Sequence, residues 1–228
     1  MNLLAIETAT ECCSVALVAG ARIFARSELA PRRHAELLLP MCEAVLAEAG
    51  LARRDLDVLA VGRRPGAFTG VRLAVSAAQG IALALGIPVV PVSSLAALAM
   101  QAPGDGGDVL AVIDARMGEV YAGLFRRSGE RVEAIGEETV GRADALRLPS
   151  SGALDVIGTG WSSYREAIEA MLASPPRWAD GARYPQASDV ARLAMPIAAA
   201  GGGIAADRVQ PVYLRDKVAL TLAEQQRR

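Results

Sequence analysis

One repeated segment constrains the fold of this 228-residue chain more than any other feature. Residues 3–7, which end in Glu7, align with residues 110–114, which end in Asp114, 107 positions further along. The same spacing aligns residues 14–18 with residues 121–125. Each copy has the pattern of an apolar strand that ends in a carboxylate and continues into a hairpin. The repeat predicts two halves of similar structure, although a chance likeness between apolar strands is the alternative.

The first hundred residues predict an alternation of strands and helices. Gly50 is typical of a helix end, Pro40 indicates a kink or a start inside the first long helix, and Ser93 is an expected N-cap. Strands are expected at residues 3–8, 13–20, 21–28, 57–62 and 87–92, and helices at residues 34–49, 71–85 and 94–101.

The Gly- and Asp-rich stretch 102–108 predicts a linker between two lobes. Beyond it, strands are expected at residues 109–114, 120–126, 131–137 and 155–158, and helices at residues 163–173 and 189–200. We therefore predict an α/β protein with a first lobe of residues 1–102 and a smaller second lobe of residues 109–228, whose C-terminal segment packs back on the first. Duplicated halves of this kind favour a two-lobed actin-like (ASKHA, duplicated ribonuclease-H-like) fold.

The composition excludes several classes of protein. A hydrophobic content of 52% with a net charge of −1 excludes a disordered chain and lacks the basic excess typical of nucleic-acid binding. Glu7 interrupts the apolar N-terminus, which indicates that it is not a secretory signal. The apolar run 73–100 is broken after Leu85, so it predicts no membrane span. Cys12, Cys13 and Cys42 suit small buried positions in a cytoplasmic protein.

Few residues could perform chemistry. His34 is the only histidine, which excludes a histidine-rich metal cluster and a catalytic triad, and we expect it to be solvated in the first turn of a helix. Glu7, Asp114 and Arg116 are possible cleft residues. The two carboxylates would either share Mg²⁺, as in a small actin-like ATPase or kinase with its own nucleotide site, or accept hydrogen bonds from the turns that follow them. We favour the second interpretation and predict no metal site and no cofactor of the chain's own.

The loop between the fourth strand and the second long helix is the most distinctive segment. Its glycines and arginines, followed by a helix N-terminus, would suit an anion or a nucleotide. The alternative is a rigid connection in which Phe68 fills the core and Thr69 caps the helix. The residues of the possible anion-binding loop are Gly62, Arg64, Gly66, Thr69, Gly70 and Arg72.

The two long helices are apolar nearly all round, and small residues dominate the second. Such helices are either covered on every side or wait for a partner. We predict a protein interface there, and bulky charged residues at Ala78 and Ala82 should then abolish a complex while leaving the fold intact. The predicted interface comprises Leu37, Leu38, Met41, Val45, Val71, Val75, Ala78, Gln79 and Ala82.

Several motifs together resemble one family. Residues 4–17, the glycine loop with its Phe-Thr-Gly-Val-Arg sequence and residues 114–121 are similar to the TsaB family, as are residues 34–40, 158–161 and 211–215. The likeness extends almost to the C-terminus. Two residues depart from the family pattern, because Arg64 stands where Gly is usual and Ala67 where Ser is usual; the first weakens the case for a phosphate-binding loop.

The resemblance implies an actin-like, catalytically silent subunit that supports TsaD, the transferase that makes threonylcarbamoyladenosine at position 37 of tRNA. It further implies a heterodimer with TsaD through helices of the first lobe, and TsaE, an ATPase, in a ternary complex. ATP and Mg²⁺ would be bound in the partner complex, and tRNA would be reached indirectly. An isolated subunit is expected to form a homodimer through the same apolar surface.

Overall fold

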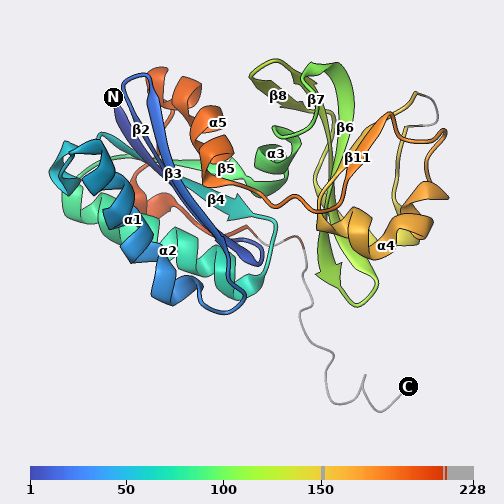
Figure 1. The fold of residues 1–228 in the computed structure, drawn as a ribbon, viewed down its shortest axis with the longest axis horizontal. Coiled ribbons are helices and arrows are strands. Elements are labelled where there is room, and N and C mark those ends of the chain that lie inside the picture. Colours follow the sequence, from blue (N-terminus) through green and yellow to red (C-terminus); the bar gives the residue numbers. More distant parts are fainter. Residues whose placement is uncertain (150–151, 213, 215–228) are drawn as a thin grey trace, which may run out of the picture.

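The computed structural model describes residues 1–149, 152–212 and 214 of the chain. It consists of two lobes side by side, each built on one sheet with helices on both faces (Figure 1). The sequence also predicts a short extended segment at residues 212–215, which lies partly outside the described residues.

The first sheet contains β1 (Asn2–Glu7), β2 (Cys12–Ala19), β3 (Arg22–Leu29), β4 (Val58–Arg64) and β5 (Val89–Ser93). Their order across the sheet is β3-β2-β1-β4-β5. β1 pairs with β2 in the antiparallel sense and with β4 in the parallel sense. All five strands were predicted, with ends that differ by one to two residues.

The second sheet contains β6 (Asp105–Arg116), β7 (Glu119–Ser128), β8 (Arg131–Ala134), β9 (Thr139–Arg142), β10 (Asp155–Ile157) and β11 (Trp178–Asp180). The order is β11-β10-β6-β7-β8, with β9 also paired to β7. β6 is again antiparallel to the hairpin strand that follows it and parallel to β10. The duplicated ribonuclease-H-like fold is therefore confirmed, while the short strands β9 and β11 were not predicted.

The repeat differs from the prediction in one detail. Ile6 pairs with Val15 in the first hairpin, and the equivalent Ile113 pairs with Tyr121 in the second. The offset is therefore 107 residues between β1 and β6 but 106 between β2 and β7, because the second turn is one residue shorter. Aligning Ser14 with Tyr121 was wrong, since a slip of one residue exchanges the two faces of a strand.

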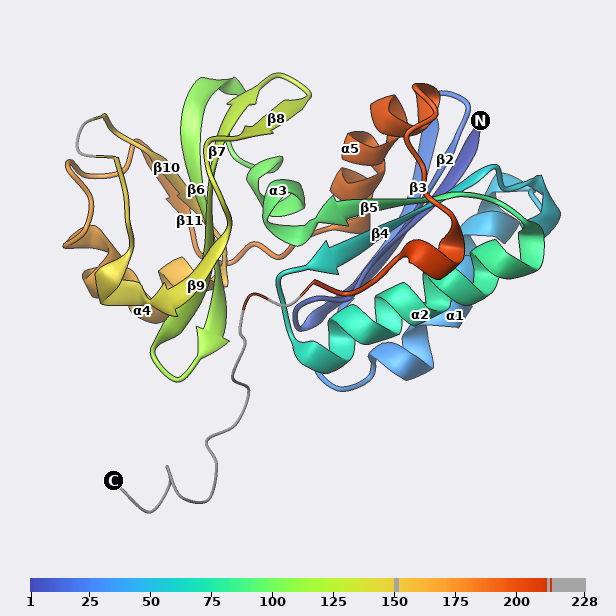
Figure 2. The same cartoon turned by 180° about the vertical axis from the view of Figure 1, so that it is seen from behind.

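Five α-helices cover the sheets in the described part of the chain: α1 (His34–Ala49), α2 (Phe68–Leu85), α3 (Ser94–Ala99), α4 (Thr159–Glu169) and α5 (Ala187–Ala199). α1 and α2 lie side by side on one face of the first sheet, and α5 lies on the other (Figures 1 and 2). α3 and α4 cover opposite faces of the second sheet. Three 3₁₀ turns, η1 (Arg53–Asp55), η2 (Ala143–Ala145) and η3 (Ala206–Arg208), complete the helical elements.

Two helices cross between the halves. α3 precedes the predicted linker, yet Leu95 and Leu98 lie in the core beneath the second sheet. α5 follows the second sheet in sequence, yet Val190 and Ala194 pack against the first sheet. β6 begins at Asp105, so the linker predicted at residues 102–108 is shorter than expected.

Helix ends lie where the sequence predicts them when a capping residue marks them. α1 has the predicted bounds, Gly50 ends it with φ 69°, and Pro40 lies inside the continuous helix. The Ser93 hydroxyl accepts a hydrogen bond from the Ala96 N–H, which confirms it as the N-cap of α3. α2 instead begins at Phe68, so the start predicted at Val71 was three residues late.

Candidate functional site

Glu7, at the end of β1, is completely buried. Its Oε1 accepts a hydrogen bond from the Ala9 N–H, and its Oε2 accepts one from the Ser94 hydroxyl, both at 2.7 Å. Burial raises the pKa of Glu7 above its ordinary value, although these two hydrogen bonds oppose the rise. Both oxygens are satisfied inside the first lobe, so Glu7 does not face the cleft, and the interpretation that it shares Mg²⁺ with Asp114 was wrong.

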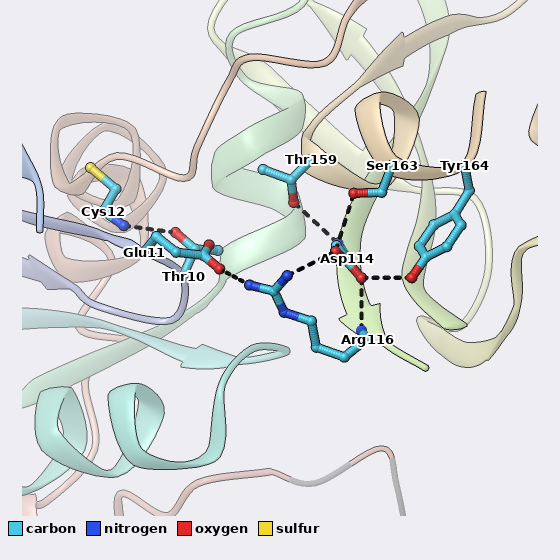
Figure 3. A network of polar contacts seen from close by, with 8 residues as sticks. All are labelled: Thr10, Glu11, Cys12, Asp114, Arg116, Thr159, Ser163 and Tyr164. Atoms are coloured by element: carbon cyan, nitrogen blue, oxygen red, sulfur yellow. Dashed lines mark hydrogen bonds and ion pairs between the residues drawn. The ribbon is translucent and has the colours of Figure 1, made fainter. Parts of the chain in front are cut away.

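Asp114 occupies the equivalent place in the second lobe but faces the cleft between the lobes (Figure 3). Its Oδ1 accepts hydrogen bonds from the Arg116 N–H at 2.7 Å and from the Tyr164 hydroxyl at 3.1 Å. Its Oδ2 accepts one from the Ser163 hydroxyl at 3.1 Å, and its own N–H donates to the Thr159 hydroxyl at 3.1 Å. The prediction that both carboxylates bind the turns that follow them is confirmed, because each accepts the N–H two residues further on.

Arg116 links the two lobes across this cleft (Figure 3). Its guanidinium lies 3.4 Å from Asp114 Oδ2 and also forms an ion pair with Glu11 of the first lobe. Arg116 has φ 65°, an uncommon backbone conformation for a residue other than glycine. The positive charge next to Asp114 is therefore supplied by the chain itself.

Four members of this network were not predicted as site residues: Glu11, Thr159, Ser163 and Tyr164. Thr159, Ser163 and Tyr164 lie on α4, about 45 to 50 positions from Asp114 along the chain. No spacing in the sequence indicates which helix will cover the end of β6, so only the fold brings them to Asp114.

The cleft has a volume of about 770 Å³ and is lined by both lobes. Asp114 and Arg116 form part of one wall, and Gly66, Thr69 and Gly70 form part of the opposite wall. Its apolar lining includes Pro31, Pro65, Phe68, Val71, Leu73, Ile113, Tyr121 and Val212. Gly62, Arg64 and Arg72, the other members of the predicted anion-binding loop, do not line the cleft.

The glycines of that loop are explained by packing against the turn that follows β1. A Cβ atom on Gly62 would lie 1.9 Å from Glu7 Oε2, and one on Gly70 would lie 2.0 Å from the Thr8 carbonyl oxygen. Gly66 is as crowded, because a Cβ there would lie 2.3 Å from the Ala9 carbonyl oxygen. The geometry supports the rigid connection, in which the glycines allow the loop to approach β1.

The details of that rigid connection differ from the prediction. Phe68 is 45% exposed, so it does not fill the core, and the Arg72 guanidinium lies 3.6 Å from the centre of its ring. Thr69 is exposed inside α2 and does not cap it, because Ala67 holds the N-cap position. Arg64 pairs with Glu138 of the second lobe at 3.3 Å. Arg64 and Arg72 therefore contact other side chains instead of the cleft.

His34 differs from its expected solvated state. It is half-buried at the start of α1 and lines the cleft. Its Nε2 is buried and has no hydrogen-bond partner among the described residues. The three cysteines are free and buried as predicted. Burial raises the pKa of Cys13 to about 11 and that of Cys42 to about 12, so the thiols of Cys13 and Cys42 stay protonated at neutral pH.

The predicted interface residues lie mostly on the wrong side of their helices. Six of them are buried against the first sheet, namely Leu38, Val45, Val71, Val75, Ala78 and Ala82. Gln79 is half-buried and donates a hydrogen bond to the Val209 carbonyl at 2.9 Å, while Leu37 and Met41 are half-buried. The prediction that Ala78 and Ala82 contact a partner directly was wrong, because both are fully buried in this chain and charge there would disrupt its core.

Comparisons with known proteins agree with this architecture. The sequence model of a family described as "TsaD: tRNA N6-adenosine threonylcarbamoyltransferase" matches residues 26–200. The "tRNA threonylcarbamoyladenosine biosynthesis protein TsaB" of Escherichia coli is 39% identical, covering 96% of both chains. The protein of the same name from Haemophilus influenzae is 35% identical and covers 96% of this chain and 95% of its own.

A solved structure supports the same assignment. "YeaZ from Pseudomonas aeruginosa" is 41% identical, has a TM-score of 0.86, and covers 93% of this chain and 99% of its own. Identity at this level over nearly the full length shows common descent as well as a common fold. This chain belongs to the family that the TsaD model describes and, within it, to the TsaB proteins of tRNA threonylcarbamoyladenosine biosynthesis.

Proposed function

We propose that this chain is a noncatalytic, cytoplasmic subunit that supports a TsaD transferase in tRNA threonylcarbamoyladenosine synthesis. It would bind TsaD through the outer surface of α1 and α2, which we call the helix-pair face. This face comprises Leu37, Met41, Leu73, Ser76, Ala77, Gly80, Ile81, Leu83 and Ala84. TsaE would join as a third protein, and tRNA would be reached through TsaD.

The observation that carries the proposal is the exposed apolar surface of α2. By length and composition, α2 is the one helix in the described residues apolar enough to span a membrane, yet only 33% of it is buried in this chain. Its buried side packs on the first sheet, whereas Leu83 on the opposite side is 63% exposed. A helix that packs on a sheet normally has polar residues on its solvent-facing side. Apolar residues on that side therefore indicate a binding partner.

The residue sizes on this face suit a second helix pair. Ser76, Gly80 and Ala84 are small and exposed, and a Cβ on Gly80 would meet no atom within 4 Å. Small side chains let two helices approach closely, and glycine in a helix interior costs about 1 kcal/mol relative to alanine. Gly80 destabilises the helix although this chain leaves room for a side chain there, which is consistent with a close contact to another protein.

The family match supports TsaD as the partner. The TsaD model matches residues 26–200, which include α1 and α2, so a TsaD transferase is expected to carry an equivalent pair of apolar helices. Two such pairs would cover one another. In the absence of TsaD, a second copy of this chain would offer the same face, and we propose a homodimer under that condition.

The cleft supports the noncatalytic part of the proposal. Arg116 neutralises Asp114, and Glu7 is enclosed in the first lobe. The described residues contain no group of three or more metal-binding side chains. ATP and Mg²⁺ would therefore act in the partner complex and not in this cleft.

The proposal is tested by size-exclusion chromatography and co-purification with TsaD from the same organism. Leu83→Glu and Gly80→Arg place charge on the helix-pair face at exposed positions, so each should abolish the complex while the melting temperature stays within a few degrees. Ile23→Glu is the matched control, because Ile23 is an exposed apolar residue on β3, outside that face. It should bind TsaD normally. Complex formation by both face variants at wild-type affinity would refute the proposed surface.

A further inference from the structure

A second groove lies beside η3 on the first lobe; it shares Val212 with the cleft and no residue with the helix-pair face. Its volume is about 510 Å³. Arg63 and Arg208 are the charged residues among those described that line it, and no acidic side chain does. The other lining residues are Pro91, Ile204, Val209, Gln210, Pro211 and Val212.

The walls of this groove are held in place by hydrogen bonds. Ile204 and Val89 exchange two backbone hydrogen bonds of 2.9 Å, which attach the wall to the edge of the first sheet. The Gln79 side chain donates to the Val209 carbonyl at 2.9 Å, which ties the same segment to α2. The groove is therefore formed before any ligand arrives, which lowers the entropic cost of binding.

The charge of Arg63 is only partly offset within the described residues, by Glu138. Arg63 is half-buried at the end of β4, and its guanidinium has no hydrogen bond or ion pair to any of them. Burial and the neighbouring Arg64 lower the pKa of Arg63 from its ordinary value. Glu138 is the nearby acid, but it is bound by Arg64 and by the Ser93 hydroxyl.

Arg208 adds a second guanidinium to the lining of the groove. It lies in η3, is exposed, and makes no ion pair with a described residue. Asp207 is its neighbour in η3 but does not line the groove. Two unpaired guanidinium groups on a preformed, partly apolar groove leave a local excess of positive charge, and a partly buried charge without a partner is unfavourable.

We propose that this groove binds a phosphate group between the guanidinium groups of Arg63 and Arg208. Guanidinium groups donate paired hydrogen bonds to phosphate oxygens, and one phosphate offers enough acceptor oxygens for two arginines. Pro91 and Pro211 would then pack against the sugar or base that carries the phosphate. The phosphate comes either from a free nucleotide or from the backbone of an RNA, and the experiment separates these two sources.

The test is isothermal titration of the full chain at low ionic strength with three probes: inorganic pyrophosphate, ATP without Mg²⁺ and an unmodified tRNA transcript. We expect saturable binding that Arg63→Gln and Arg208→Gln each weaken about tenfold, the usual effect of losing a charge-assisted hydrogen bond. Arg54→Gln is the matched control, because Arg54 is an exposed arginine of another 3₁₀ turn in the same lobe and removes the same charge.

The pattern of binding identifies the phosphate source. Binding of ATP and pyrophosphate with these variant effects assigns the groove to a nucleotide, and such effects with the transcript alone assign it to RNA. The proposal is overturned if no probe binds saturably, or if Arg54→Gln weakens binding as much as the two groove variants do. Arg63→Lys, which keeps the charge, should retain part of the affinity and shows that the fold is intact. Because the groove and the helix-pair face share no residue, TsaD binding should persist in the groove variants.

Discussion

Glu7 and Asp114 occupy the same place in the two halves of the chain, yet their surroundings are opposite. Glu7 ends β1 and Asp114 lies two residues before the end of β6, and both accept the N–H two residues further on. Glu7 is sealed inside the first lobe by Ser94 and by Gly62, whereas Asp114 faces the cleft beside Arg116. Duplication thus preserved the local backbone motif, while the packing around it decided what each carboxylate does.

The difference originates in what lies next to each strand end. Ser94 begins α3, which crosses from the first lobe to the second and so places a hydroxyl against Glu7. In the second half, the turn is one residue shorter and places Arg116 beside Asp114. A carboxylate in the first setting is part of the core; in the second it contacts Arg116, which pairs with Glu11 of the other lobe.

The largest expected effect is an unequal loss of stability when each carboxylate is removed. Glu7→Ala leaves the Ser94 hydroxyl and the Ala9 N–H buried without an acceptor and creates a cavity, so the free energy of unfolding should fall by about 3 kcal/mol. In Asp114→Ala, the donors that lose their acceptor can hydrogen-bond to water instead. The free energy of unfolding should therefore fall by only about 1 kcal/mol. Urea denaturation of both variants measures the difference, and equal losses would show that the two sites are equivalent.

The second prediction concerns pH. The pKa of Glu7 is raised in the folded chain, so its contribution to stability is complete below the unfolded pKa near 4.5 and is lost as the pH rises through the folded pKa. Glu7→Gln removes this titration. The stability of wild type relative to Glu7→Gln should therefore decrease as the pH rises above about 4.5.

Thermal denaturation at several pH values measures that difference. Asp189 titrates in the same direction, since burial raises its pKa to about 6, but it is present in both proteins and cancels in the comparison. Asp114→Asn serves as the counterpart in the second half. A relative stability that stays constant or increases with pH would contradict the sealed environment assigned to Glu7.

The smallest expected effect on stability comes from the ion pair between the lobes. Arg116→Gln removes the pair with Glu11, but both side chains are partly exposed, so the free energy of unfolding should change by less than about 1 kcal/mol. Hydrogen exchange at residues 8–11 and 114–119 should nevertheless increase, because the lobes lose a direct link. Arg165→Gln is the matched control, since it removes an exposed pair within α4 alone. Equal exchange in the two variants would show that Arg116 does not hold the lobes.

Part of the candidate site was predictable and part was not. The glycines of the loop between β4 and α2 made that loop distinctive in the sequence. The structure explains these glycines, because Gly62 and Gly70 lie close to β1 and the turn after it. The helix-pair face was predicted on the right helices but with the wrong residues. Both helices are apolar nearly all round, so the sequence has no polar side to show which way each helix faces, and Ala78 could not be distinguished from Gly80.

Local patterns along the chain determined the five strands of the first sheet, four of the six strands of the second, the duplicated α/β fold, the bounds of α1 and the buried state of the cysteines. These depend on hydrophobic periodicity and on turn and cap residues. Tertiary structure alone decided that α3 crosses to the second sheet, that α5 is a helix that returns to the first, and that Glu7 is enclosed while Asp114 meets Arg116. It also decided which side of α2 is free and that Arg63 and Arg208 share a groove. These features depend on contacts between residues far apart in the chain, and a single sequence contains no signal for which distant elements will pack together.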